Sequence, residues 1–482
     1  MKIIGNANPH LHYYAYNCSL VKPIRPNKDS HMANLYKELA IISKLGFPVI
    51  LIYLTDVGMA VIATIASGQY SAVDQAAVGL SNTFYLTALT FFLMALSAVV
   101  PITSQLDGAG RRKEIGIVGR QGILIALCFS AIVIVLILAT RSLITYLEID
   151  PAIAPIAREY LWVIVWVVPL DLLAAVVIFL STGLGKTIWP SVIAFSSLPV
   201  NALFTWIFVF GKFGMPEMGG AGCAVAIVAA ISFRFLCNIS LLYLDYFQEI
   251  QLFVFDKWND RDHFREIIKV GLPIGGQGIV MFGFLSLASI LIAYEGVAAL
   301  AAHNVGANVI MASFLFIHGL SVGTVIRTGN LVGENQHARL SDVGVAAIVG
   351  SLVALLLVAL VFAVARQEIA ALYSSDIDVL LILNNLLLLA LLIKLGEDPG
   401  VAIAALLEGC KDTKMIFYCR LAGVWGVAFP LAYILLSTKG LYGFWIGIAV
   451  GQLVATVLLY IRMKWVLRNP EYIYRLRDKV VI

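Results

Sequence analysis

The stretch PITSQLDGAGRRKEI at residues 101–115 has a counterpart 225 positions later, IRTGNLVGENQHARL at residues 326–340. At the same offset the chain aligns with itself without a gap over a much longer region. The matched positions include glycine, proline and charged residues: Gly46, Pro48, Gly108, Arg141 and Lys186 fall on Gly271, Pro273, Gly333, Arg366 and Lys411. Chance matches in a hydrophobic chain are mostly apolar, so this register indicates an internal duplication. In membrane proteins a duplication of this length is typical of two-lobed transporters whose substrate site lies between the lobes.

The composition is that of a membrane protein. Hydrophobic residues make up 61% of the 482 residues, charged residues only 13%, and the mean hydropathy is +0.92. Soluble domains carry about 25% charged residues. The net charge of +4 is too small to suggest nucleic-acid binding. The GLGK sequence that ends at Lys186 lacks the spacing of a phosphate-binding loop, and we expect no enzyme activity, no cofactor and no bound metal.

The sequence predicts an all-α integral membrane protein with twelve transmembrane helices in two six-helix lobes. A helix needs about 20 apolar residues to cross a bilayer. Because each repeat has an even number of helices, both repeats enter the membrane from the same side and are related by an axis along the membrane normal. The twelve apolar runs lie at roughly 45–66, 78–101, 119–140, 157–182, 188–210, 222–243, 267–293, 303–326, 342–365, 377–406, 415–437 and 442–462.

Lysine and arginine are unevenly distributed between the two sets of predicted loops. One set contains most of them, and it includes the basic tail at residues 464–482. The opposite loops contain little beyond Arg141, Arg158, Lys212, Arg366 and Lys439. Cytoplasmic loops of membrane proteins are enriched in Lys and Arg, so both termini are expected in the cytoplasm.

Polar interruptions divide the chain. Residues 37–243 are expected to form an N-lobe with helices 1–6, residues 244–266 a cytoplasmic linker, and residues 267–463 a C-lobe with helices 7–12. Residues 1–36 form an N-terminal extension without the apolar core of a signal peptide. Met32 opens an amphipathic lead into the first helix, so a translation start at Met32 stays open as an alternative.

A series of short motifs occurs in order along this duplicated chain. They are SGQYSAVDQAAVGL, PITSQLDGAGRRKEI and GLGKTIWP in the first half, and VGLPIGG, ALAAHNVGANV and VIRTGNLVGEN in the second. From about residue 36 to 465 the chain resembles the multidrug and toxic compound extrusion (MATE) family, in its bacterial NorM-type branch. The resemblance implies a V-shaped pair of six-helix bundles in the bacterial inner membrane. It also implies export of organic, usually cationic, compounds in exchange for sodium ions or protons, and we expect a monomer.

Ionisable residues inside the predicted helices are the candidates for binding the ion and the substrate. A charge at the bilayer centre costs about 2.5–3.5 kcal/mol even on lenient scales, so such residues usually line a cavity or form pairs. Asp56 lies midway along the first helix, Asp171 in the fourth and Arg234 in the sixth. The tenth helix contains a cluster of three: Lys394, Glu397 and Asp398.

Of the predicted helices with ionisable residues, the tenth contains the most. Lys394 and Glu397 are three residues apart, which predicts an ion pair on one helical face. Pro399 removes a backbone donor, which predicts a local break, and transporters bind small cations at breaks beside carboxylates. The internal offset places Asp171 opposite Gly396, so each lobe is expected to carry a carboxylate at a similar depth. A purely structural ion pair is the alternative.

The chain departs from the family at its acidic positions. The resemblance places the family's first-helix aspartate at Ala63 and the acid of the seventh helix at Met281. The acid of the tenth helix is retained as Glu397, in place of the more usual aspartate. Asp56 lies two helical turns before Ala63 on the same face and could serve the same cavity at a different depth. A hydrogen bond within the lobe, without a role in transport, is the alternative for Asp56.

Other polar and aromatic residues have simpler interpretations. Asn201 matches an asparagine of the family's fifth helix, which either bonds substrate or bridges helices. His303 and His318 are expected to pack at or near the ends of the eighth helix. Aromatic residues such as Tyr53 either stack on a planar cation or pack within the lobes.

These observations predict a secondary active exporter that works by alternating access, with Glu397 as the principal coupling residue. Two alternatives stay open. The first is an exporter of a specific endogenous metabolite, such as a siderophore or another anionic compound, or a flippase for a lipid-linked substrate, because Arg234 would suit an anion. The second is a membrane scaffold or sensor without transport, because Ala63 and Met281 lack the family's acids.

Overall fold

The computed structural model of the protein describes residues 28–146, 149–253, 260–373 and 377–477. Within these ranges the chain is almost entirely helical and contains no β-strand. The helices of the first half are α2 (Lys28–Tyr70), α3 (Ala72–Leu96), α4 (Val99–Gly108), α5 (Arg112–Leu143), α6 (Ile153–Ile164), α7 (Val168–Gly183), α8 (Ile188–Val209) and α9 (Gly220–Leu241). Those that follow are α10 (Asp245–Glu249), α11 (Arg261–Ala293), α12 (Val297–Gly333), α13 (Leu340–Tyr373), α14 (Ile377–Gly409), α15 (Thr413–Leu421), α16 (Phe429–Arg468) and α17 (Pro470–Arg477).

Eleven helical stretches of the described residues are long and apolar enough to cross a membrane. The last of them, Thr413–Arg468, has 56 residues, more than twice the length of about 20 that one crossing needs. It folds back at Gly440, where φ is +58° and ψ is −149°. As a result, the backbone at Gly447 packs against Ala432. This stretch supplies two antiparallel crossings, so the twelve predicted helices are confirmed.

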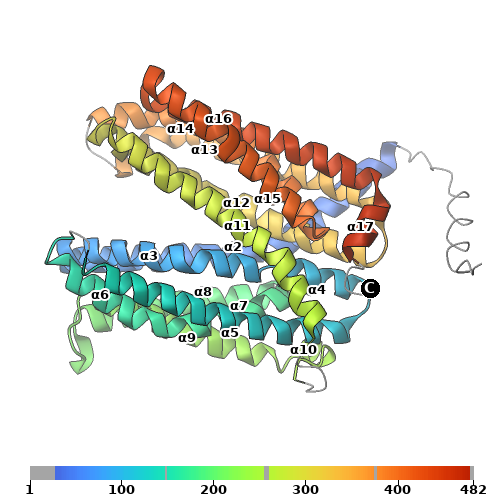
Figure 1. Cartoon of the computed structure of the whole chain (residues 1–482), viewed down its shortest axis with the longest axis horizontal. Coiled ribbons are helices and arrows are strands. Elements are labelled where there is room, and N and C mark those ends of the chain that lie inside the picture. The colour runs from blue at the N-terminus through green and yellow to red at the C-terminus, as the bar shows by residue number, and fades with distance from the viewer. Residues whose placement is uncertain (1–27, 147–148, 254–259, 374–376, 478–482) are drawn as a thin grey trace, which may run out of the picture.

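The helices form two lobes that lie one above the other in Figure 1. Helices α3 and α5–α9 form the N-lobe, α12–α16 form the bulk of the C-lobe, and α11 runs diagonally from one to the other. Each lobe has its own apolar core. Tyr160 is among the largest buried side chains in the N-lobe core, and Trp445 in that of the C-lobe. The two-lobe fold expected from the duplication is therefore confirmed.

Glycines hold the lobes together at one end of the molecule. A Cβ atom on Gly108 would lie 2.2 Å from the carbonyl oxygen of Asn330, and one on Gly333 would lie 2.1 Å from that of Gln105. These two contacts are the same contact in the two repeats, because Gly108 and Gln105 become Gly333 and Asn330 when 225 is added. Small residues let helices in membranes approach at backbone distance. The two repeats therefore contact each other through surfaces that are equivalent under the internal duplication.

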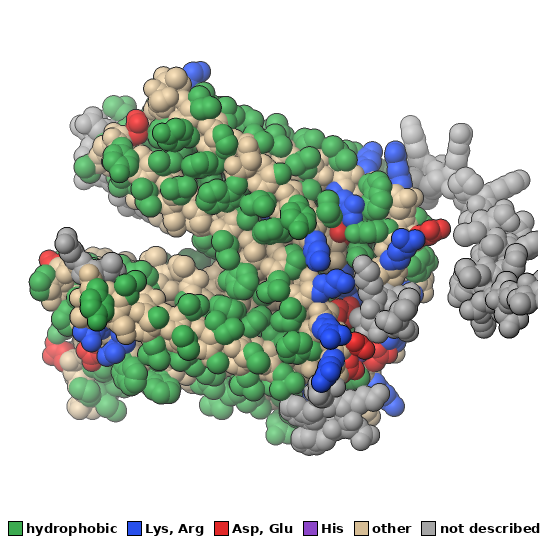
Figure 2. All heavy atoms as spheres, in the orientation of Figure 1, with side chains coloured by type: hydrophobic (Ala, Val, Ile, Leu, Met, Phe, Trp, Pro, Cys, Tyr) green, Lys and Arg blue, Asp and Glu red, His purple; other side chains and the backbone are tan. Residues whose placement is uncertain are grey.

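Charged side chains lie at the same closed end. Glu38 on α2 accepts hydrogen bonds from Arg327 on α12 at 2.6 and 3.0 Å, and it also pairs with Arg339. The positions equivalent to Glu38 and Arg339 in the other pair of repeats are His263 and Glu114, whose side chains lie 3.8 Å apart. Figure 2 shows that Lys and Arg side chains gather at this end, while a cleft separates the lobes at the opposite end.

The helix boundaries and interruptions differ in part from the expected ones. Helix α11 begins at Arg261, within the segment 244–266 that the sequence marks as a linker. The fourth crossing is interrupted by one turn of 3-10 helix at Val165–Val167 between α6 and α7. The eleventh contains a π-helical segment at Ala422–Ala428. Irregular helical turns of this kind are common near functional sites.

Candidate functional site

Three charged side chains that are far apart in the sequence meet inside the N-lobe. Arg234 on α9 donates from Nη1 to Asp56 Oδ1 at 3.0 Å and from Nη2 to Asp171 Oδ1 at 2.9 Å. The hydroxyl of Tyr85 on α3 donates to Asp171 Oδ2 at 3.5 Å. Helices α2, α3, α7 and α9 therefore supply one network, and we call Asp56, Asp171 and Arg234 the N-lobe triad.

The triad is buried on one side and accessible on the other. The side chains of Asp171 and Arg234 are 10% and 9% exposed, whereas that of Asp56 is 51% exposed. Asp56 lies midway along α2, so its exposed carboxylate is at the middle of a membrane-spanning helix and not at its end. Removing a charge from water costs several kcal/mol unless the charge is paired. The triad keeps Asp171 and Arg234 paired and leaves one carboxylate accessible.

Asp171 is positioned by the interruption of the fourth crossing. It stands in the first turn of α7, directly after the 3-10 turn at Val165–Val167, and Pro169 precedes it. The first turn of a helix carries a partial positive charge, which favours a carboxylate there. The irregular backbone beside a carboxylate thus occurs in the fourth crossing.

Asn201 on α8 is fully buried, and neither atom of its amide has a hydrogen-bond partner among the described residues. It therefore does not bridge helices in this structure. Thr205 Oγ1 and Asn238 Oδ1 are also buried without a partner in the described part of the chain. Each buried polar group without a partner costs about 1–3 kcal/mol. Such oxygens can accept hydrogen bonds from water or coordinate a cation.

In the C-lobe, Lys394 pairs with Asp398. Its Nζ lies 2.7 Å from Asp398 Oδ1, and both side chains are buried. The predicted pair between Lys394 and Glu397 is therefore wrong. At about 100° per residue, the fourth residue along a helix is offset by about 40° and the third by about 60° in the opposite sense. Asp398 thus lies closer to the direction of Lys394, and Glu397 projects elsewhere.

Pro399 does not interrupt α14, which continues to Gly409. The break predicted in the tenth helix is therefore absent. The hydroxyl of Thr456 on α16 donates to the carbonyl of Gly396, one turn before the proline. Proline frees the carbonyl four residues before it, here that of Leu395, and transmembrane helices tolerate this where local adjustment or the surroundings satisfy the freed group.

Glu397 is buried but has no basic group at ion-pair distance among the described residues. Its electrostatic neighbours are Asp398 and Arg420, the latter on α15. Arg420 also interacts with Glu408 on α14. We call these five residues the C-lobe cluster: Lys394, Glu397, Asp398, Glu408 and Arg420.

A row of aromatic side chains connects the C-lobe cluster to the N-lobe. Lys394 Nζ lies 5.4 Å from the ring centre of Phe314, and Phe314 stacks on His318 with ring centres 5.5 Å apart. His318 Nε2 contacts the hydroxyl of Tyr53 on α2, with ring centres 4.3 Å apart. Tyr53 is three residues before Asp56, one turn along α2. We call Phe314, His318 and Tyr53 the aromatic row.

The two histidines have different environments. His303 is buried, and its Nδ1 accepts a hydrogen bond from Trp445 Nε1 at 3.2 Å, so its packing role is confirmed. His318 lies midway along α12 and reaches the other lobe, so the expectation of a helix-end position is wrong. Tyr85 and Phe314 could not be identified from the sequence. Their residue types are common in this chain, and nothing in their spacing distinguishes them.

The fold and these charged clusters define a membrane transporter built from two six-helix lobes. The MatE family profile matches the chain twice, at residues 48–207 and 273–434, so the protein belongs to the MATE family. The two matches begin 225 residues apart (273 − 48), which is the offset of the internal duplication. Members of this family are transporters and not enzymes, and this chain is a multi-pass membrane transporter.

Curated relatives match over almost their whole length. The chain is 30% identical over 444 residues to the multidrug resistance protein NorM of Photobacterium profundum, covering 90% of this chain and 97% of the relative. It is 32% identical over 439 residues to the multidrug resistance protein MdtK of Yersinia pseudotuberculosis, covering 88% and 95%.

Solved structures share the fold at lower identity. The eukaryotic MATE transporter AtDTX14 superposes with a TM-score of 0.82 at 18% identity, covering 93% of this chain and all of that one. The Vibrio cholerae MATE transporter VcmN in its bent form gives 0.82 at 17% identity, covering 92% and 99%. A transporter of the MOP superfamily from Pyrococcus furiosus, described as having a binding pocket of reverse polarity, gives 0.79 at 19% identity, covering 90% and 97%.

Proposed function

We propose that this protein is a secondary active exporter of organic cations in the bacterial inner membrane, driven by inward flow of sodium ions or protons. The observation that carries the proposal is Asp56. Its carboxylate is half exposed midway along a membrane-spanning helix, and Arg234 pairs it with the buried Asp171. Relatives named for multidrug resistance support an organic substrate.

Charge balance favours a cation over an anion. With its groups ionised, the N-lobe triad has one positive and two negative charges, a net charge of −1 (+1 − 2). The C-lobe cluster has two positive and three negative charges, also a net charge of −1 (+2 − 3). Arg234 is held by two carboxylates, and of its nitrogens Nε has no hydrogen-bond partner among the described residues. This pairing supports a cationic over an anionic substrate.

Glu397 has the features of the coupling residue. Asp398 is neutralised by Lys394, whereas Glu397 is buried beside a second carboxylate without a basic partner of its own at ion-pair distance among the described residues. The carboxylate of Glu397 therefore offers oxygen ligands to a small coupling ion inside the lobe. Asn201, Thr205 and Asn238 offer unpaired oxygens for the same purpose in the N-lobe.

The aromatic row supplies a route by which the two lobes respond to each other. An ion shifts an equilibrium between two packings only when it binds one of them more tightly. Charge neutralisation at Glu397 changes the field at Lys394, which contacts Phe314, and the row ends at Tyr53 beside the N-lobe triad. We propose that closing the cleft rearranges this row.

Orientation follows from the distribution of basic residues. The closed end carries most of the Lys and Arg side chains (Figure 2), and cytoplasmic surfaces are enriched in them. We therefore propose that both termini are cytoplasmic and that the structure represents a state open to the outside. Glu38, Arg327 and Arg339 would then close the cytoplasmic side.

The test is ion-driven uptake of cationic dyes into everted membrane vesicles. Glu397→Gln should abolish uptake driven by an imposed sodium or proton gradient, and Asp56→Asn should weaken it while the protein stays folded and inserted. Lys394→Met should shift the pH dependence of uptake. Glu295→Gln, at an exposed acid between α11 and α12, is the matched control and should behave like the unchanged protein.

Each alternative has its own outcome in this assay. Uptake by Glu397→Gln that still requires an ion gradient would remove Glu397 from the coupling role. Uptake of anionic but not cationic probes would favour a metabolite exporter. Absence of gradient-driven uptake with every probe would favour a scaffold or sensor.

A further inference from the structure

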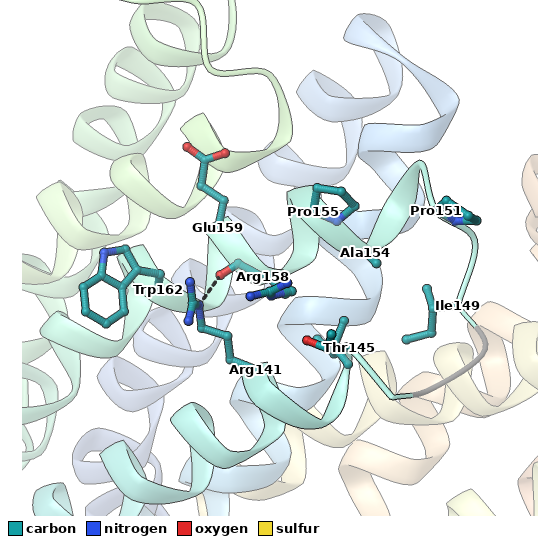
Figure 3. A pocket seen from close by; sticks show the side chains of 10 residues that line it. Arg141, Thr145, Ile149, Pro151, Ala154, Pro155, Arg158, Glu159 and Trp162 are labelled. Carbon is teal, nitrogen blue, oxygen red and sulfur yellow. Dashed lines mark hydrogen bonds between the residues drawn. The ribbon is translucent and has the colours of Figure 1, made fainter.

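A cavity of about 500 Å³ lies where α5 ends and α6 begins, at the end of the N-lobe away from the closed, basic end. Figure 3 shows its lining, which includes Arg141 from α5 and Thr145, Arg158 and Trp162. The volume falls within the range of about 300–1,000 Å³ that is usual for ligand sites. The cavity is separate from the N-lobe triad, none of whose members lines it.

Two guanidinium groups share this cavity with Glu159, and neither forms an ion pair with a carboxylate of the described residues. Arg141 Nε donates to the carbonyl oxygen of Arg158 at 3.1 Å, and its guanidinium lies 5.3 Å from the ring centre of Trp162. Arg158 Nε is buried and has no hydrogen-bond partner among the described residues. No described carboxylate lies within 4.0 Å of either guanidinium, and Figure 3 shows Glu159 turned away from both. Two like charges held together in this way favour an anion between them.

Arginine is suited to one class of anion in particular. Its planar fork of donors matches the oxygens of a phosphate group and binds two of them at once. The hydroxyl of Thr145 supplies a further polar group in the lining. Trp162 in the lining is 45% exposed; it contacts Trp166, which is 64% exposed, and Tyr146, which follows Thr145, is 84% exposed. Tyr and Trp are enriched at the level of lipid headgroups.

The other repeat does not contain this arrangement. The internal offset carries Arg141 to Arg366, but it carries Arg158 and Trp162 to Leu383 and Leu387, both fully buried in the C-lobe core. One lobe thus keeps a single arginine where the other has a pair beside an aromatic ring. Arg366 is therefore a matched control that the chain itself provides.

We propose that Arg141 and Arg158 form a binding site for a phosphate group at the outer end of the N-lobe. The phosphate belongs either to the headgroup of an anionic phospholipid or to a free anion. The site is independent of the coupling residues, so it stands whether or not Glu397 drives transport.

The experiment measures binding to the purified full chain in neutral detergent at about 150 mM salt, where weak surface charge interactions are screened. One arm titrates dioleoyl phosphatidylglycerol against dioleoyl phosphatidylcholine and counts bound lipid by native mass spectrometry. The other arm titrates inorganic phosphate by calorimetry at constant ionic strength. The variants are Arg141→Ala, Arg158→Ala, Arg158→Lys and the control Arg366→Ala.

Arg141→Ala and Arg158→Ala should each weaken binding about tenfold or more, as expected for loss of a charge-assisted hydrogen bond. Arg158→Lys keeps the charge but loses the fork, and it should give an intermediate loss, which also covers the case that Arg158→Ala does not fold. Arg366→Ala should bind as the unchanged protein does. An effect on phosphatidylglycerol alone assigns the site to a lipid, and an equal effect on inorganic phosphate assigns it to a free anion. Binding of both probes that is the same in the double variant Arg141→Ala/Arg158→Ala overturns the proposal.

Discussion

Replacing Arg234 by methionine tests whether the N-lobe triad is a real electrostatic unit. The substitution keeps a long apolar side chain but removes the charge that pairs with Asp56 and Asp171. Asp171 is then a buried carboxylate with only the hydroxyl of Tyr85 beside it. Breaking a buried pair by removing one partner costs about 3–5 kcal/mol. The pair with the half-exposed Asp56 adds at most about 1 kcal/mol.

The magnitude translates into a shift of the unfolding temperature. A cooperative unit of roughly 200 residues, the size of the N-lobe, loses about 2–4 °C per kcal/mol. The total of about 3–6 kcal/mol should therefore lower the midpoint of Arg234→Met by about 6–24 °C. The measurement is thermal unfolding of the detergent-solubilised protein, followed by its intrinsic fluorescence. Arg366→Met, at a partly exposed arginine without an ion pair in the described part of the chain, should change the midpoint little.

The double variant makes the test specific to charge. In Arg234→Met/Asp171→Asn the unpaired carboxylate is gone, so at least about 2 kcal/mol of the loss should return, because a neutral replacement of a buried pair is often tolerated. An unchanged midpoint in Arg234→Met would refute the electrostatic account of the triad. So would a double variant that is less stable than Arg234→Met alone, since the loss would then come from packing.

Three further predictions concern the contact between the lobes and the topology. Gly333→Ala places a Cβ 2.1 Å from the Gln105 carbonyl oxygen, so it should cost about 1–3 kcal/mol and lower the unfolding midpoint. The control Gly79→Ala, with open space around it, should leave the midpoint unchanged. Equal midpoints of the two variants would contradict the backbone contact. Tyr53→Phe removes the hydroxyl that contacts His318 and should slow dye export several-fold without loss of expression, and an unchanged rate would exclude a role of that contact. A reporter fused after Ile482 should be active in the cytoplasm, and an active periplasmic phosphatase at that position would reverse the proposed orientation.

The sequence by itself determined the architecture of this protein. The 225-residue repeat, the twelve apolar runs and their lengths are properties of residue order, and each run has to form a helix because a bilayer offers no other partner for its backbone. The turn at Gly440 was predicted only as a gap between two apolar runs, and it lies where that gap does. Single ionisable residues in apolar runs were also identifiable, since their cost in a membrane makes each one a candidate.

Which charges pair with which was decided by the tertiary structure. Asp56 and Asp171 are more than a hundred positions apart, and Asp171 and Arg234 are sixty-three positions apart. Only the packing of α2, α7 and α9 brings the two carboxylates within 3.0 Å of the Arg234 guanidinium. Lys394 pairs with Asp398 and not with Glu397. Spacings of three and four residues both place side chains on one helical face, so the sequence alone does not distinguish the two pairs. The continuity of α14 through Pro399 was also decided by the fold, because a transmembrane helix continues through a proline only where its surroundings accommodate the freed carbonyl.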